Sequence, residues 1–562
     1  MGMKWWGWGD ERVSFSHADK PALGPFLNKH IGVDVDRVAS AAPPFADLDV
    51  PAPGVPDALR EALEEAVGAA QVSLDPLDRV VHARGKSLRD LVRHRRGELG
   101  RVPDVVVRPA DEQQVAAVLH AALDHDAVLI PFGGGTNISG SLEAPADETR
   151  AVISLDLARL DQVLEIDERS RLARVQAGAL GPALEEQLGR RGWTLGHFPD
   201  SFSHSTLGGW IATRSSGMQS DKYGDVADLT RAIRVVTPNG IVATRPVPAA
   251  STGPSVREMV LGSEGRLGVI TEATVHVHRA PERREILGYL FPDWPRALEA
   301  MRELAESEAT PSVTRVSDAP ETQFSFATRK APTLLDRVQS AALQTFLRRA
   351  RGFDVDAMCL SFIGFEGSPR HVELQRRLVS RIVSRHGGLC VGKGPGVLYD
   401  QKKFDTPYIR DFLLDRGVLG DVSETSAPWS ALPGLYDHVV AEARRAIAEQ
   451  GVPGYVMCHL SHSYHAGACL YFTFAMNPEG AAGDPLDIYA AVKTAVQQAF
   501  IDAGGTLSHH HAVGTEHAEW LEQDVSRAGA AMIEALLTGV DPGGNLNPGK
   551  IVPTRARAGE SA

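Results

Sequence analysis

Three adjacent histidines, His509, His510 and His511, form the densest group of proton-transferring side chains in this sequence of 562 residues. Imidazole titrates near neutral pH, so such a group can accept a proton and return it within one reaction. In an extended segment, His509 and His511 would share one face and His510 would take the other, so at most two of them could point into one site. The same alternation opposes three ligands on one metal ion, and we therefore favour acid–base chemistry over a metal cluster.

A run of glycines between residues 131 and 137 offers a second kind of chemistry, the binding of phosphate. The segment reads PFGGGTN, and consecutive glycines let backbone N–H groups approach a pyrophosphate with no Cβ in the way. Taken alone, three glycines in a loop more often form a simple turn. The next regular element is a predicted strand at Ala151–Asp156, so a dinucleotide bound on a helix N-terminus, as in Rossmann proteins, is not expected.

Two further segments combine small polar residues with glycines. HFPDS at residues 197–201 runs on to STLGGW at 205–210, and GSEGRLGVITEA spans 262–273. Together with PFGGGTN, in this order and at these separations, they resemble the FAD domain of the vanillyl-alcohol-oxidase superfamily over about residues 101–281. The resemblance implies two small α+β subdomains that clasp FAD between them.

The resemblance also implies how the cofactor is held. Some members attach the flavin to a histidine in the first glycine loop, where this sequence has Thr136 and Asn137, so non-covalent FAD is expected. His197 is expected close to the isoalloxazine. The residues that the resemblance places at the cofactor are Pro131, Phe132, Gly133, Gly134, Gly135, Thr136, Asn137, His197, Asp200, Ser201, Phe202, Ser203, His204, Ser205, Thr206, Thr213, Arg214, Ser215, Ser216, Glu264, Gly265, Arg266, Leu267, Gly268, Val269 and Ile270.

Two families share this flavin domain, and the rest of the chain has to be assigned to one or the other. The ending NPGK at residues 547–550 resembles that of the FAD-linked 2-hydroxyacid dehydrogenases. Many of those enzymes bind a divalent metal through the histidines of an H-x-G-D-G-N-x-H segment, with which we align Tyr464 and Tyr471. A phenol is a poor metal ligand at neutral pH, and His510 stands where a glutamate ligand is expected, so no metal site is predicted.

The same substitutions resemble the alkyldihydroxyacetonephosphate synthase family. SHSYHAGACLYFTF at 461–474 and LSHHHAVG at 507–514 look like its signature segments, as do KWWGWG, YIRD and ETSAPW. His465 departs from the family pattern, which has an aspartate, and so does Ser423, where an aromatic residue is usual. The end-to-end resemblance implies that the acyl group of acyl-dihydroxyacetone phosphate is exchanged for a fatty alcohol through a flavin N5 adduct, with no net redox change.

The resemblance gives roles to particular residues. Tyr471 is the expected acid–base group near the substrate carbon, with His509–His511 beside it. Arg410 is expected to hold the phosphate, since a guanidinium can bond it through two N–H groups, and Arg315 matches a further arginine near the substrate. On the pattern alone, Tyr471 would be a core aromatic of a strand and both arginines would be ordinary ion-pairing residues. An FAD-dependent 2-hydroxyacid dehydrogenase or oxidase, and a flavin-binding protein with little turnover, stay open as alternatives.

The elements that must position these residues divide the chain into several parts, because single cores rarely exceed roughly 250–300 residues. We expect an α+β fold with an N-terminal helical arm (1–100), an FAD-binding domain (101–281), a cap or substrate domain (282–505) and a C-terminal segment that returns to the flavin site (506–562). Asp111 is expected to cap a helix in the FAD domain. In and after the cap, apolar spacing predicts helices at Trp294–Ser307, Ala331–Arg349, Ser368–His386, Leu432–Glu449 and Leu486–Ala503.

Composition limits the partners. The net charge of −13, from 58 basic and 71 acidic residues, argues against nucleic acid. Four cysteines with no C-x-x-C pair fit a reducing compartment. We expect a cytoplasmic protein with no signal peptide, transmembrane segment or peroxisomal C-terminal signal. The expected partners are small lipid substrates; peripheral membrane contact and a homodimer are both compatible with the sequence, which fixes neither.

Overall fold

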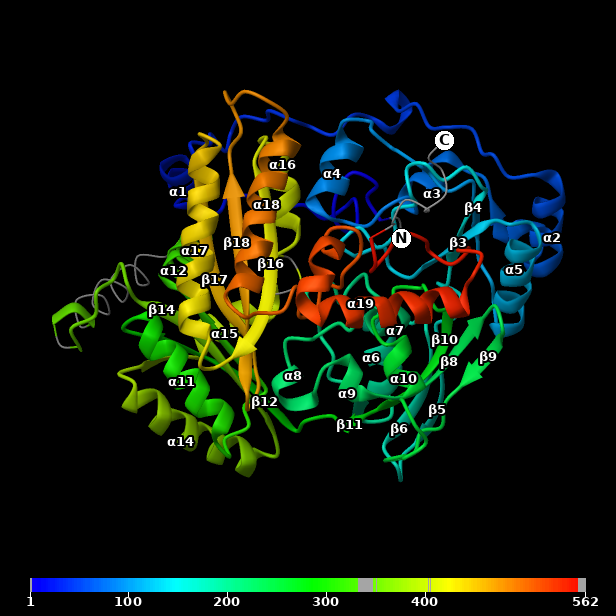
Figure 1. The fold of residues 1–562 in the computed structure, drawn as a ribbon. Helices are drawn as coiled ribbons and strands as arrows, with labels where there is room; N and C mark the ends of the chain where they lie inside the picture. The colour runs from blue at the N-terminus through cyan, green and yellow to red at the C-terminus, as the bar shows by residue number, and fades with distance from the viewer. Residues whose placement is uncertain (1–2, 332–346, 350, 403, 405, 554–562) are drawn as a thin grey trace.

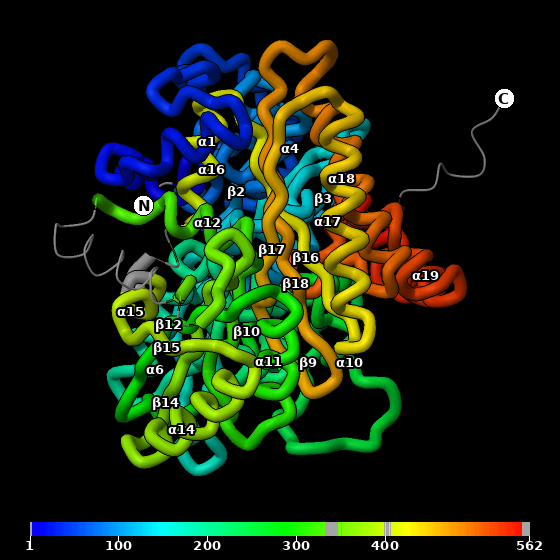
Figure 2. Tube along the Cα trace, turned by 90° about the vertical axis from the view of Figure 1, so that its left-hand side faces the viewer, coloured from blue at the N-terminus to red at the C-terminus, as the bar shows by residue number. Residues whose placement is uncertain are grey.

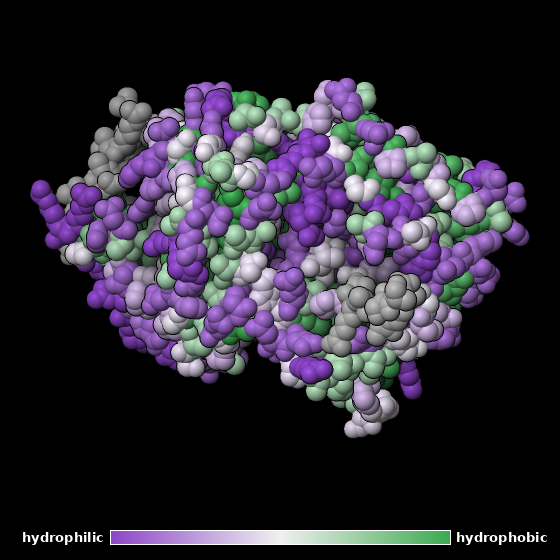
Figure 3. Space-filling model, turned by 45° about the horizontal axis from the view of Figure 1, so that its top comes forward, coloured by the Kyte–Doolittle hydropathy of each residue, from purple (hydrophilic) through white to green (hydrophobic). Residues whose placement is uncertain are grey.

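The computed structural model describes residues 3–331, 347–349, 351–402, 404 and 406–553. The fold is α+β, as expected: two small sheets stand on one side of the molecule and one large sheet on the other (Figure 1). The helix predicted at Ala331–Arg349 lies almost entirely outside the described residues. Hydrophilic and hydrophobic side chains are interspersed on the face drawn in Figure 3.

The first hundred residues form a mainly helical arm that wraps the rest of the chain. Its opening loop closes on itself through a bridge between Met3 and Asp10. A buried carboxylate far along the chain, that of Asp411, accepts hydrogen bonds from Trp8 N and Lys4 Nζ. The arm contains α1 (Leu23–Ile31), η1 (Phe45–Asp47), α2 (Asp57–Val67), η2 (Ala69–Gln71), β1 (Val72–Ser73), α3 (Pro76–Val81) and α4 (Leu88–Arg95).

The first small sheet carries the glycine loop. Its strand order is β1-β2-β4-β3, and β4 pairs in parallel with both β2 and β3. Asp111 caps the helix that covers it, as predicted, by accepting from Gln114 N. No helix follows the glycine loop, and the next element is a strand, also as predicted. The elements are β2 (Val105–Val107), α5 (Glu112–Asp124), β3 (Val128–Phe132) and β4 (Val152–Asp156).

The second small sheet has the order β5-β6-β10-β8-β9, and each neighbouring pair is antiparallel. Short helices and a two-stranded β7–β11 ribbon surround it. Its elements are β5 (Val163–Asp167), β6 (Leu172–Gln176), α6 (Gly181–Gly189), β7 (Trp193–Thr194), α7 (Leu207–Thr213), α8 (Ser220–Tyr223), α9 (Val226–Leu229), β8 (Thr230–Thr237), β9 (Gly240–Ala243), α10 (Val256–Val260), β10 (Val269–His276) and β11 (His278–Arg279).

The large sheet has seven strands in the order β15-β12-β14-β13-β17-β18-β16. Its core lies against amphipathic helices, of which α17 and α18 run side by side along the strands (Figure 2). The strands are β12 (Arg283–Phe291), β13 (Val313–Ser317), β14 (Cys359–Gly367), β15 (Leu389–Gly392), β16 (Leu419–Pro428), β17 (Gly454–Ser463) and β18 (Gly467–Met476). The helices are α11 (Trp294–Glu306), α12 (Ala319–Ala327), α14 (Pro369–Arg385), α15 (Lys393–Lys402), α16 (Tyr408–Leu414), α17 (Leu432–Glu449) and α18 (Pro485–Asp502).

The predicted helices of the large domain agree with α11, α14, α17 and α18 to within a residue at each end. After α18 the chain returns to the small sheets through η3 (Ala518–Trp520) and α19 (Leu521–Val540). There, Leu546 bridges Leu129 of β3 in parallel. Among the described residues, no helix combines the length and the apolar character needed to cross a membrane.

Candidate functional site

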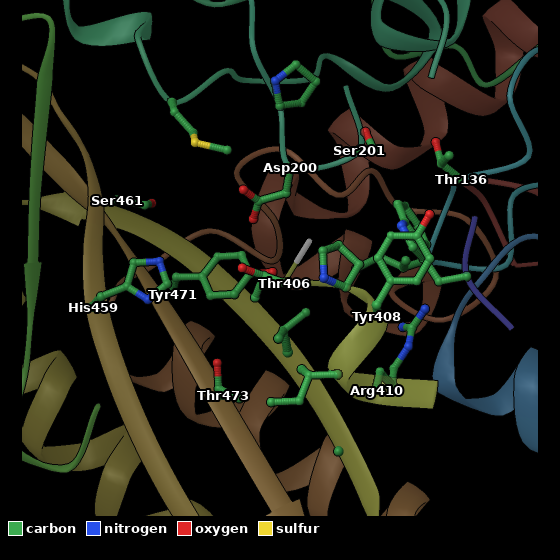
Figure 4. A pocket seen from close by; sticks show the side chains of 18 of the residues that line it. Thr136, Asp200, Ser201, Thr406, Tyr408, Arg410, His459, Ser461, Tyr471 and Thr473 are labelled. Carbon is green, nitrogen blue, oxygen red and sulfur yellow. The ribbon is translucent and has the colours of Figure 1, made fainter. Parts of the chain in front are cut away.

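One cavity of about 1740 Å³ runs between the small sheets and the large sheet. It is larger than the roughly 300–1,000 Å³ of an ordinary ligand site, so it has room for a cofactor together with a long substrate. The glycine loop forms one wall, β17 and β18 form another, and α16 lies across from them. Figure 4 shows Tyr471 beside His459 on the strands, with Arg410 and Tyr408 facing them from the helix.

The glycine loop needs its glycines because another loop presses against it. A Cβ on Gly134 would lie 1.7 Å from the carbonyl oxygen of His204, and one on Gly133 would lie 2.4 Å from Thr206 Oγ1. Gly135 adopts a left-handed conformation, with φ of 66°. Backbone from two segments is thereby brought together at the cavity wall, which is the arrangement that a pyrophosphate requires.

Many of the predicted cofactor residues line this cavity, and the rest lie in the core or on the surface. Those that line it are Pro131, Phe132, Gly133, Gly134, Gly135, Thr136, Asn137, Asp200, Ser201, Ser205, Thr206, Thr213, Ser215, Ser216, Glu264, Gly265, Gly268 and Ile270. Those outside the lining are His197, Phe202, Ser203, His204, Arg214, Arg266, Leu267 and Val269. Phe202, Leu267 and Val269 belong to the hydrophobic core, and Arg214 pairs with Glu258 on the surface.

Buried polar groups at the flavin side have unmet hydrogen-bonding capacity. The Oγ of Ser216 and Nδ1 of His197 have no partner. Burial lowers the pKa of His197 to about 3, so its imidazole is neutral. Glu264 is held by Ser141 Oγ and by the N–H groups of Val513 and Gly514, which fix the C-terminal segment at the cavity. The close loops, the cavity volume and the unpartnered Oγ of Ser216 all fit FAD, whereas His197 lies outside the cavity lining.

Tyr471 stands at the end of a chain of polar contacts on the strands. Its ring stacks on His459 at a centroid distance of 4.8 Å. Nδ1 of His459 lies 2.8 Å from Glu321 Oε2, while Arg315 Nη2 donates to Glu321 Oε1 at 2.8 Å. Burial opposes ionisation of Glu321, but His459 and Arg315 outweigh it and lower the pKa of Glu321 to about 2. Arg315 therefore reaches the cavity already paired with a carboxylate.

Burial raises the pKa of Tyr471 well above its usual value, and the carboxylates of Asp200 and Glu424 add to this shift. At neutral pH the side chain is a protonated phenol, which can donate a proton or a hydrogen bond. Burial lowers the pKa of His510 and of His511 to about 4, although Glu424 opposes the shift. The two imidazoles are therefore neutral and able to accept a proton, so donor and acceptor groups face the same cavity.

The three histidines do not form an extended segment. Residues 508–511 make a tight turn, in which His511 N donates to Ser508 Oγ at 3.1 Å. His510 and His511 line the cavity, whereas His509 turns away and bonds the phenol of Tyr464 at 2.6 Å. The prediction that His509 and His511 share a face applied to an extended segment, so its condition is not met; two of the three histidines reach the cavity. The segment bends because the buried carboxylate of Glu424 accepts the backbone N–H groups of all three histidines.

Arg410 lies on α16 and lines the cavity opposite Tyr471. Its Nε is buried and has no hydrogen-bond partner. The adjacent Asp411 points to the N-terminal loop instead, where Lys4 Nζ lies 3.2 Å from its Oδ2. A guanidinium with free donors on a cavity wall is suited to a phosphate, more so than Arg315, whose Glu321 partner competes for its donors.

A second cluster was missed by the sequence reasoning. His462, Cys469, His509 and His510 place ligand atoms within 4.8 Å of one another, and this group could hold a metal ion. His462 and Cys469 are separated by the same number of positions as the two histidines of the H-x-G-D-G-N-x-H segment, as are Tyr464 and Tyr471. The spacing alone therefore allows two alignments with that segment, and it could have revealed the one through His462 and Cys469.

Of the two departures from the synthase pattern, His465 is exposed in the hairpin turn and Ser423 is buried with an unpartnered Oγ.

Comparisons with known proteins agree with the two halves of this site. Residues 103–244 match a family described as FAD binding domain, and residues 280–551 match FAD linked oxidases, C-terminal domain. FAD is therefore the cofactor of this chain. The two-subdomain FAD fold is also that of a p-cresol methylhydroxylase structure, which shares 16% identity with a TM-score of 0.63 over 89% of this chain and 98% of that one.

Two relatives match nearly the whole chain. The alkyldihydroxyacetonephosphate synthase of Dictyostelium discoideum is 37% identical over 98% of this chain and 94% of its own length. A solved alkyldihydroxyacetonephosphate synthase structure is 35% identical, with a TM-score of 0.84, and covers 97% of this chain and 98% of that one. Both span the small sheets, the large sheet and the N-terminal arm alike.

Proposed function

We propose that this chain, which belongs to the alkyldihydroxyacetonephosphate synthase family, is a flavin-dependent transferase of ether-lipid synthesis. It would exchange the acyl group of acyl-dihydroxyacetone phosphate for a fatty alcohol, with no net redox change. The observation that carries the proposal is a single cavity in which a protonated phenol, neutral imidazoles and an arginine with free donors face one another.

Arg410 would bind the phosphate of the substrate. Its side chain lines the cavity, its Nε has no partner in the protein, and a guanidinium can bond two phosphate oxygens at once. Arg315, held by Glu321, would orient His459 and Tyr471 and add positive charge on the far side of the cavity.

Tyr471, His510 and His511 would move the proton on the carbon next to the ketone. An imidazole of neutral charge can take the proton, and the phenol of Tyr471 can supply a proton or a hydrogen bond to the oxygen that gains charge. FAD, held between the glycine loop and the loop of residues 200–206, would supply a nucleophilic ring nitrogen to the reaction. Thr136 and Asn137 at the glycine loop support non-covalent binding of the cofactor.

The remaining cavity would hold the hydrocarbon chains. Its wall continues from the polar site to apolar side chains of the arm and the large domain, and each buried CH₂ stabilises the bound chain by roughly 0.8 kcal/mol. The apolar lining includes Phe15, Phe26, Leu27, Ile31, Phe324, Phe326, Leu360 and Phe362. A fatty acyl group and a fatty alcohol both match this surface.

A second candidate is an FAD-dependent 2-hydroxyacid dehydrogenase or oxidase. The cluster of His462, Cys469, His509 and His510 favours it, because imidazole and thiolate are good ligands for a divalent ion. Burial raises the pKa of Cys469 well above its usual value, and the charge of Glu424 adds to that shift, so the thiol is neutral until a metal displaces its proton.

The test uses the purified holoenzyme. Acyl-dihydroxyacetone phosphate and labelled fatty alcohol should yield labelled ether lipid, before and after treatment with a chelator. Anaerobic addition of 2-hydroxyacids should leave the flavin spectrum oxidised. Rapid bleaching by a hydroxyacid, together with a stoichiometric divalent ion and no labelled ether product, would replace the synthase by the dehydrogenase.

A further inference from the structure

We propose that Glu424 is the positioning residue that holds the His509–His511 turn and places a fixed negative charge beside the imidazoles that face the cavity. The inference rests on the proposed function and adds to it a residue that contacts neither substrate nor flavin. Glu424 lies on β16, opposite Tyr471 of β18 in the strand register.

The carboxylate is the centre of the turn. Its Oε1 accepts the N–H groups of His510 and His511, each at 3.0 Å, and Ser508 Oγ at 2.8 Å. Its Oε2 accepts the N–H of His509 at 2.7 Å. Three consecutive backbone N–H groups that converge on one anion form a nest, a geometry that a neutral or shorter side chain cannot reproduce in full. The directions of the three imidazoles therefore depend on one side chain.

The same carboxylate lies close to the rings. Its oxygens are 3.6 Å from His510 Nδ1 and 3.5 Å from His511 Nδ1, and its side chain is fully enclosed. Burial opposes its ionisation, but the three histidines, through their charge when they are protonated and through the backbone N–H groups that the carboxylate accepts, hold the pKa of Glu424 well below its usual range. It is a permanent anion at neutral pH, beside imidazoles that burial keeps neutral.

Other charged groups also surround the turn. His510 faces His459 of β17, and His511 faces Lys493 of α18, His517 and Asp421 of β16. Cys469 of β18 lies 3.8 Å from Glu424 Oε2 and is neutral. Of these groups, Glu424 is the carboxylate whose oxygens lie 3.6 Å from His510 Nδ1 and 3.5 Å from His511 Nδ1.

The proton step balances without a further reagent. The C–H bond next to the substrate ketone breaks, its electron pair stays on the substrate as an enolate, and the proton moves to a ring nitrogen of His510 or His511. The resulting imidazolium is paired with Glu424, which keeps its own charge and takes no proton. The proton later returns to carbon by the reverse path. An aspartate orients and stabilises the histidine of serine proteases in the same manner.

The test compares Glu424→Gln, Glu424→Asp and a matched control, Thr425→Val. Thr425 is the next residue on β16 and donates to Thr506 O at 2.6 Å, so it ties the same loop to the same strand without a charge. The holoenzymes are assayed for ether exchange across pH, with flavin content measured for each. Glu424→Gln should lower kcat by about 10²–10³-fold with KM for acyl-dihydroxyacetone phosphate changed less than about threefold. The acidic limb of its pH–kcat profile should move to lower pH, because the histidine that accepts the proton loses the neighbouring anion and becomes less basic.

Glu424→Asp keeps the charge and should return the acidic limb toward that of the wild type, even where Glu424→Gln folds poorly. Thr425→Val should leave the limb in place. The proposal is overturned if Glu424→Gln keeps wild-type kcat and pH profile, or if Thr425→Val reproduces both changes. If the wild-type enzyme itself has no exchange activity, the proposed function is refuted and this inference with it. If the wild type is active and only the variants behave otherwise than expected, the inference alone is refuted.

Discussion

Removal of the Arg410 guanidinium should weaken substrate binding strongly while the fold and the flavin stay intact. The side chain of Arg410 lines the cavity and its Nε has no partner in the protein, so truncation breaks no hydrogen bond of that atom. Two charge-assisted hydrogen bonds at roughly 1.5–3 kcal/mol each, less some water-mediated recovery, give a loss of about 3–4 kcal/mol. That loss raises KM for acyl-dihydroxyacetone phosphate by about 10²–10³-fold in Arg410→Ala.

The assay measures ether exchange against substrate concentration, with inhibition by dihydroxyacetone phosphate as an independent measure of phosphate binding. Arg410→Lys should recover part of the affinity, since the charge remains but the planar fork is lost. Lys330→Ala is the matched control: this cation also lines the cavity but pairs with Asp19 at 2.9 Å, and its removal should leave KM within about twofold. An unchanged KM in Arg410→Ala, or an equal rise in Lys330→Ala, refutes Arg410 as the phosphate clamp.

Three further predictions concern the site, the cofactor and the contact of Asp221 in α8 with β13 and β17. Tyr471→Phe should retain yellow FAD and lose exchange by about 10²–10⁴-fold, measured as labelled alcohol incorporation; full activity would remove Tyr471 from the reaction. Acid precipitation of the protein should release the flavin into the supernatant, and flavin that stays with the pellet would contradict non-covalent binding. Burial raises the pKa of Asp221 to about 7, so its protonated form stabilises the fold at low pH and that contribution is lost as pH rises through 7. Asp221→Asn, which keeps contacts to Thr314 and Ser463, should therefore raise the free energy of unfolding by on the order of a few kcal/mol at pH 8 and by less at pH 5; a gain independent of pH would contradict this origin.

Local patterns in the sequence predicted local structure well. Asp111 caps α5, and the apolar spacing of α17 is read correctly at both ends, because these features depend on residues a few positions apart. The glycine loop was recognised for the same reason. The loop presses against the backbone of His204, and no local pattern contains that contact. Only the family resemblance brought the two segments together at the cofactor.

The course of the histidine turn was not predictable from its own residues. An isolated SHHH segment has no reason to bend, and its bend comes from Glu424, a carboxylate 85 positions away from His509 in the chain. His462 and Cys469 were missed because Tyr464 and Tyr471 fit the same spacing, and the register of the β17–β18 hairpin decides between the two alignments. One contact joins a loop to a strand and the other joins two strands of a hairpin, and the order of residues along one segment determines neither.

The bond between Lys4 and Asp411 spans 407 positions of sequence. During synthesis, the opening loop therefore leaves the ribosome long before α16 exists, and until then it can contact only nearer partners such as Lys86, His94 and Arg95. A long-range closure of this kind comes late in folding, since its entropic cost is met only after the intervening parts have assembled. The cavity wall that α16 forms is thus completed among the last steps, and a nascent chain interrupted before residue 411 would lack this wall together with β16, β17 and β18.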